Sequence, residues 1–133
     1  MYALIEKFFE DTIAQALSPT YLKLENIAYQ STNGVPYAKL SHLRGPRRSS
    51  ALGSKQILYQ GIVQVDVMTQ ANSGPGSSEG MLSRVEAGFD NGMQFDISGS
   101  QLSIMSVSRG VSSEDPVWYT VPVSIYWSLR KQQ

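Results

Sequence analysis

The chain has 133 residues, of which 41% are hydrophobic and 17% charged, and its eleven basic and eleven acidic residues leave no net charge. This length predicts a single domain, residues 1–133, and the balanced charge excludes an overall field that would draw the molecule to nucleic acid or an anionic membrane. Because the sequence has no cysteine, disulfides, thiolate metal sites and cysteine nucleophiles are excluded as well.

The first predicted element is an amphipathic helix at the N-terminus. Its apolar and aromatic residues share one side of a helical wheel: Ile5, Phe8, Phe9, Ile13, Ala16 and Leu17. The helix should end at Ser18-Pro19, where proline cannot continue the hydrogen-bond ladder. Acidic residues throughout this stretch argue against a signal peptide, and no apolar segment approaches the roughly 20 residues of a membrane span. We therefore expect the helix to pack on a sheet, in a soluble protein that stays where it is made unless it is built into something larger.

Two short strands and a basic loop are expected next. Residues 21–29 alternate weakly, as an edge strand does, and residues 37–43 form a second strand. The irregular loop after them, residues 44–54, contains Arg44, Arg47 and Arg48. From Lys39 to Lys55 the chain has five basic residues and no acid, so this segment is the one electrostatic signal above background. Its arginines can bind carboxylates of a neighbouring protein or phosphates of nucleic acid, or they can remain solvated.

The longest predicted strand is Ile57–Thr69, around which the rest of the chain is organised. From Tyr59 to Val67 the odd positions are apolar or glycine, whereas the even positions are mostly polar. A long strand with this alternation is expected at the centre of a sheet, with one face on the core. Residues 70–78, which are rich in glycine and serine, should form a flexible connection.

A second and shorter amphipathic helix should follow this connection. Its apolar side would carry Met81, Leu82, Val85 and Phe89. Ser77 or Ser78 can cap its N-terminus. Asp90-Asn91-Gly92 should stop it, because these residues accept a left-handed backbone.

Strands are predicted for the rest of the chain. Residues 95–97 and 101–109 are short candidates, and residues 110–116 form an acidic loop. Val117–Leu129 has an apolar residue at every odd position, which makes it a natural neighbour of the long strand, and Pro122 predicts a bulge or an exposed edge there. The whole pattern predicts an α+β fold, a single antiparallel or mixed β-sheet of about four to six strands with two helices packed on one face.

The sequence shows no catalytic or metal-binding constellation. His42 is the one histidine, and without a Gly-x-Ser-x-Gly motif a partly buried or surface residue is a better interpretation than a catalytic one. Glu114 and Asp115 are adjacent in a loop, where they need not converge as paired catalytic carboxylates do. The glycine-rich segments around Gly74 and Gly99 lack the lysine of a phosphate cradle. We therefore expect no enzyme, no metal site and no cofactor.

Several stretches carry a resemblance to a known family through their order and spacing. They are Ala16–Pro19, Leu24–Ile27, Asn33–Tyr37, Tyr59–Val67, Gly74–Gly76, Phe95–Ile97 and Trp118–Ile125. With these stretches the chain resembles, over nearly its full length, the tail terminator (tail completion) proteins of long-tailed bacteriophages.

This resemblance implies a structural protein of the virion that is assembled in the cytoplasm of the host bacterium. Such subunits form a ring, expected to be hexameric, at the head-proximal end of the tail tube, where the ring ends tube polymerisation and provides the surface for head–tail joining. The partners would be copies of the chain itself, the tail tube protein, the head–tail connector protein and passing DNA, but no membrane. Arg44, Arg47 and Arg48 are then candidate contacts to the tube, the connector or DNA. Strand 117–129 is a candidate for pairing with a neighbouring subunit.

Two other interpretations remain open. The chain can be another head–tail joining protein or a tail tube subunit, and a tube subunit would polymerise into long tubes rather than closed rings. Alternatively, it can be a small nucleic-acid-binding module that uses the basic loop and binds DNA in a salt-sensitive way.

Overall fold

The computed structural model describes residues 1–133 apart from 32–33, 46–47, 50–55, 75, 77 and 133. The described part contains two helices, α1 (Tyr2–Leu17) and α2 (Glu79–Ala87). Its strands are β1 (Tyr21–Lys23), β2 (Tyr37–Arg44), β3 (Arg48–Ser49), β4 (Gln56–Gln70), β5 (Gln94–Ile97), β6 (Ser100–Arg109), β7 (Ser113–Glu114) and β8 (Trp118–Gln132).

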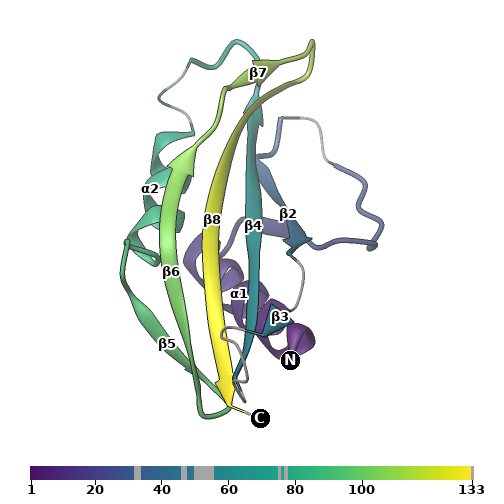
Figure 1. Cartoon of the computed structure of the whole chain (residues 1–133). Helices are drawn as coiled ribbons and strands as arrows, with labels where there is room; N and C mark the ends of the chain where they lie inside the picture. The colour runs from purple at the N-terminus through teal and green to yellow at the C-terminus, as the bar shows by residue number, and fades with distance from the viewer. Residues whose placement is uncertain (32–33, 46–47, 50–55, 75, 77, 133) are drawn as a thin grey trace.

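The strands form one mixed sheet in the order β1-β2-β4-β8-β6-β5. Neighbouring strands are antiparallel except for β1 and β2, which are parallel. The two-residue strands β3 and β7 pair with β4 and β8 beside this path. Figure 1 shows a long, curved sheet with both helices on the same side of it. The predicted α+β class is therefore confirmed, including the mixed sheet and the two helices on one face.

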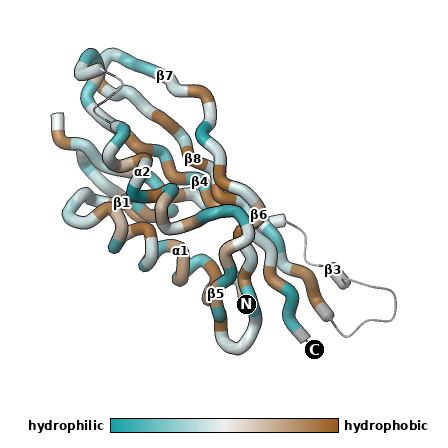
Figure 2. Tube along the Cα trace, turned by 90° about the vertical axis from the view of Figure 1, so that its left-hand side faces the viewer, coloured by the Kyte–Doolittle hydropathy of each residue, from teal (hydrophilic) through white to brown (hydrophobic). Residues whose placement is uncertain are grey.

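The core lies between the sheet and the two helices, and β4 and β8 supply most of its sheet side. These two strands pair along their whole length of 15 residues each, from Gln56 opposite Gln132 to Gln70 opposite Trp118. Their odd residues point to the helices and are buried, as the alternating pattern predicts. Figure 2 shows hydrophobic residues recurring along both strands. Burying a side chain of this size is worth about 1.5–3 kcal/mol each, so the pair dominates the folding free energy of the sheet.

Aromatic rings join the helices to this core. Phe9 of α1 lies 5.5 Å from Phe89 and 6.2 Å from Trp127, measured between ring centroids. The four residues of α1 that are fully buried, Ile5, Phe9, Ile13 and Leu17, follow the helical spacing predicted for it. The predicted apolar side of α2 is likewise buried at Met81, Leu82 and Val85.

The place of β8 in the sheet corrects one prediction. Residues 117–129 were expected to offer an edge to a neighbouring subunit, but β8 lies between β4 and β6 and is paired on both sides. The predicted irregularity at Pro122 is present, because β6 pairs with β8 only up to Val123 and β7 pairs with it from Thr120. Pro122 has no N–H to donate, so the ladder on this side of β8 is interrupted where proline requires it.

Three element boundaries also differ from the predicted ones. β1 ends at Lys23 instead of residue 29, since Asn26 adopts a left-handed backbone with φ 59°. α2 ends at Ala87, before the predicted stop at residues 90–92, because Gly88 N and Phe89 N bond to carbonyls three residues back and tighten the last turn. β2 includes Arg44, which was assigned to the loop.

Candidate interaction surfaces

The predicted arginine site is divided between a strand end and a neighbouring segment. Arg44 is the last residue of β2, and its guanidinium binds both carboxylate oxygens of Glu6 in α1, with Nη2 2.7 Å from Oε1. This hydrogen bonding raises the pKa of Arg44 above its ordinary value. Arg47 lies outside the described residues, and for Arg48 the structure describes the backbone, which pairs with Leu58 of β4. Arg44 and Arg48 thus lie along the same edge of β4.

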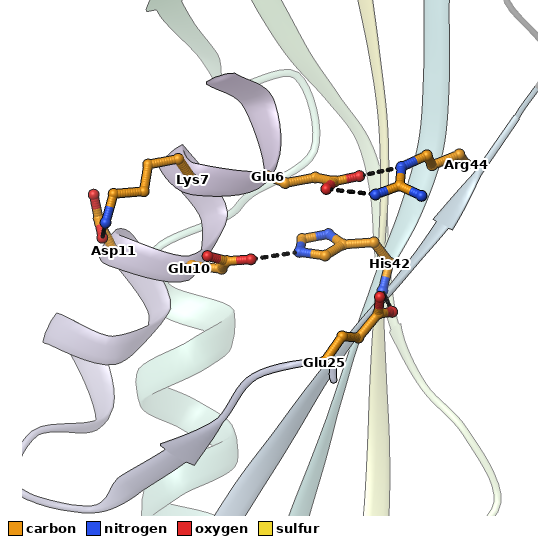
Figure 3. Close-up of polar contacts among 7 residues, drawn as sticks. All are labelled: Glu6, Lys7, Glu10, Asp11, Glu25, His42 and Arg44. Carbon is orange, nitrogen blue, oxygen red and sulfur yellow. Dashed lines mark hydrogen bonds and ion pairs between the residues drawn. The ribbon is translucent and has the colours of Figure 1, made fainter. Parts of the chain in front are cut away.

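The contact between Arg44 and Glu6 belongs to a polar seam between α1 and β2 (Figure 3). Two turns of α1 place Glu6 and Glu10 on the side that faces β2, where His42 and Arg44 alternate with outward-pointing residues. The His42 ring is 5% exposed, and its Nε2 lies 3.2 Å from Oε2 of Glu10. The histidine is therefore buried and attached to the helix, in agreement with the non-catalytic interpretation of the sequence.

Glu25 protects the part of β2 that β1 does not cover. β1 pairs with β2 only from Tyr37 to Lys39, so the backbone beyond this point faces away from the sheet without a neighbouring strand. The carboxylate of Glu25 accepts a hydrogen bond from the backbone N–H of His42 (Figure 3). An unpaired strand edge is a template for another strand, and a carboxylate bonded to it limits such pairing.

The opposite face of the sheet, which the helices do not cover, carries a row of apolar residues. Leu43 of β2 lies opposite Ile62 of β4, and Ile62 lies opposite Tyr126 of β8. Leu43 is 55% exposed and Tyr126 is 39% exposed. Together with Gln60 they line a hollow of about 370 Å³ between the three strands. We call this set of four residues, Leu43, Gln60, Ile62 and Tyr126, the sheet hollow.

A second hollow, of about 820 Å³, lies farther along the same face and is polar. Serine and glutamine side chains of β5, β6 and β8 line much of it, together with the exposed Arg130. Arg130 lies opposite Leu58, which itself lies opposite Arg48, so two arginine positions share one row across the strands. The sequence analysis did not single out Arg130, because its proximity to the basic segment arises from strand pairing.

The sheet hollow was also missed in the sequence. A signal was present, since Ile62 and Tyr126 interrupt the mostly polar even positions of two strands whose odd positions form the core. Exposed apolar residues are common singly, and only the strand register shows that these lie side by side.

The described part of the chain contains no group of three or more histidine, cysteine, aspartate or glutamate side chains placed to hold a metal ion. Within the same described residues, no helix has the length and apolar character needed to cross a membrane.

Comparison with known proteins gives one family and one shared fold. A family model described as phage tail terminator protein matches residues 1–127. One solved structure covers 100% of this chain and 98% of its own chain, with a TM-score of 0.73 and 21% sequence identity. At this identity the likeness shows the fold alone. No curated protein matches the chain at a significant level.

Proposed function

The chain belongs to the phage tail terminator family, a family of structural phage proteins associated with the tail, and from this premise we propose that it forms a hexameric ring at the head-proximal end of the tail tube. The ring ends tube polymerisation and provides the surface to which the head is joined. The observation that carries this proposal is the family match over residues 1–127, which spans both helices and nearly all of the sheet.

The proposed partners are copies of the chain, the tail tube protein and the head–tail connector, with DNA passing through the ring. The uncovered sheet face supports such contacts, because it combines an apolar row with a polar hollow beside it. Arg44, Arg47 and Arg48 are the proposed contacts to acidic surfaces of the tube or connector, or to DNA. Arg44 also holds α1 through Glu6, so its substitution should affect the fold as well as the contact.

The mass of the purified chain tests the ring directly. We expect closed six-membered rings in negative-stain images and a matching mass in sedimentation experiments, either at high concentration or after purified tail tubes are added. Rings that cap one end of each tube and stop further growth would support the terminator role.

Two outcomes would replace this proposal. Long tubes formed by the chain alone would assign it to the tube itself. Salt-sensitive retention of DNA by a chain that stays monomeric with tubes present would favour a nucleic-acid-binding module.

A further inference from the structure

An exposed arm closes one end of the sheet. We use this name for residues 110–117, which join β6 to β8 through β7 and lie at the end of the sheet farthest from the C-terminus (Figure 1). All eight of these residues are exposed, and Val111, at 91%, has the largest exposed fraction of any large hydrophobic residue in the described part of the chain. An apolar side chain displayed in this way has no structural reason inside the subunit.

The arm has a defined shape although nothing covers it. Ser113 and Glu114 pair with β8, and Gly110 N donates to the Pro122 carbonyl at 2.8 Å. The Asp115 carboxylate accepts hydrogen bonds from the backbone N–H groups of Val117 and Trp118, at 2.8 and 2.6 Å. These bonds lower the pKa of Asp115, with the bond from Trp118 contributing most, so the arm keeps its negative charge at neutral pH. A surface that is ordered before it binds loses less entropy on docking.

The arm and the sheet hollow are complementary in character. The arm presents apolar Val111 and Val117 together with two acids and no base. The hollow presents Leu43, Ile62 and Tyr126, and it lies beside the segment from Lys39 to Lys55, which has five basic residues and no acid. Apolar contact gives such an interface its affinity, whereas opposite charges favour the correct partner and orientation.

The arm of a subunit cannot reach the hollow of the same subunit. Its base is fixed at Pro122, five residues along β8 from Trp127, which borders the hollow, and five residues of strand span roughly 17 Å. Any contact between the two therefore joins different copies. Because the arm and the hollow are different surfaces, this contact is head-to-tail and repeats from copy to copy, which closes a ring when the rotation between copies permits.

We infer that the arm, residues 110–117, docks in the sheet hollow of a second copy of this chain, with Val111 against Leu43 and Ile62. This inference deepens the proposed function and rests on it, since it specifies which surfaces join neighbouring subunits of the ring. The acidic side of the arm then faces the basic segment of the neighbour.

Disulfide trapping tests this contact, because the natural chain has no cysteine and each introduced thiol is unambiguous. The double variant V111C/L43C should form covalent oligomers up to the size of the ring on oxidation. The matched control is V111C/L4C, because Leu4 is 51% exposed, close to the 55% of Leu43, but lies on α1 on the other side of the sheet. Docking raises the local thiol concentration, so we expect about tenfold more covalent oligomer from V111C/L43C than from the control.

A second pair of variants tests the same contact without cysteine. Val111→Asp should raise the concentration needed for half-assembly at least about tenfold, whereas Val111→Ile should leave it unchanged. Circular dichroism melting should be the same for both variants, because the side chain of Val111 is exposed in the subunit.

The outcomes separate this inference from the proposed function. Rings in the images with no V111C/L43C bond, or with equal bonding in the control, would overturn the docking contact and leave the ring intact. Covalent chains that stay open would support the contact and contradict the ring. If neither bonds nor rings form with tubes present, both proposals are wrong.

Discussion

At position 61 the sheet has no room for a side chain. A Cβ added to Gly61 would lie 2.8 Å from the Leu43 carbonyl oxygen and 2.8 Å from Cζ2 of Trp127. The absence of that carbon lets the Trp127 ring fill the helix side of β4 and also brings β2 close enough to border the sheet hollow. One glycine therefore links the core packing to the shape of the exposed surface.

Gly61→Ala should lower the free energy of unfolding by about 1–3 kcal/mol, because the methyl group overpacks a site bounded by backbone and a buried ring. Urea denaturation measures this loss. Gly80→Ala in α2 is the matched control, since nothing lies within 4 Å of its added Cβ, and helix propensity predicts a gain of up to about 1 kcal/mol. Equal stability of G61A and the natural chain would show that β2 and Trp127 can move apart without loss.

At the scale of elements, a single arginine attaches α2 to the sheet. Arg109, at the end of β6, donates to both oxygens of Glu86 at 2.7 and 2.8 Å and to both oxygens of Glu79 at 2.9 and 3.0 Å. The bonds to Glu86 and then those to Glu79 raise the pKa of Arg109, and the bond from Arg109 lowers the pKa of Glu79. The seam of Glu6, Glu10 and β2 attaches α1 in a similar way.

Arg109→Gln should make α2 less stable on the sheet in a pH-dependent way. A carboxyl group with a lowered pKa in the folded state stabilises the fold above its ordinary value of 4.5, and this stabilisation is lost as the pH falls through the lowered value. The free energies of unfolding of the natural chain and R109Q should therefore differ at pH 7 and converge near pH 3, as urea denaturation at each pH would measure.

Arg84→Gln is the control for this prediction, because Arg84 lies on the same helix and makes one long hydrogen bond, 3.5 Å, to the Ser18 carbonyl. It should show little difference at either pH. A constant difference between R109Q and the natural chain from pH 7 to pH 3 would mean that Arg109 acts through packing and not through its carboxylate partners.

At the scale of the whole molecule, charges are divided between layers. The helix side carries the ion pairs of Glu6, Glu79 and Glu86, which hold the helices to the sheet. The uncovered face carries serine, glutamine and the apolar row, with the basic segment at its border. The helix side therefore consumes its charges in folding, and the other side retains surfaces for partners.

Replacing Arg44, Arg47 and Arg48 with glutamate should block tail completion, because the reversed charge repels acidic partner surfaces or DNA. The double variant R47E/R48E separates this contact from the bond that Arg44 makes to Glu6, and it should have the same effect with less loss of stability. The measurement is infectious yield from a phage that depends on the supplied protein, together with thermal melting of the purified variant.

The control K7E/R84E makes the same change of charge as R47E/R48E on exposed helix positions. Its infectious yield should stay near that of the natural protein. Undiminished yield from R47E/R48E would exclude Arg47 and Arg48 as contacts.

Much of the fold was predictable because it depends on local periodicity. A period of two along β4 and β8 places odd residues on one face, whichever strands lie beside them, and the helical spacing of Ile5, Phe9 and Ile13 defines one buried side of α1. The order and spacing of stretches along the chain also carried the family resemblance, which the family match over residues 1–127 bears out.

Only the tertiary structure decided which residues from distant parts of the chain lie together. Strand order placed β8 inside the sheet, and register brought Leu43, Ile62 and Tyr126 into one row, although 83 residues separate the first from the last in sequence number (126 minus 43). The same packing joined Arg44 to Glu6 and left Val111 exposed. Periodicity specifies the face on which a side chain lies, but its neighbours depend on long-range pairing, in which the burial of all strands and both helices is satisfied together.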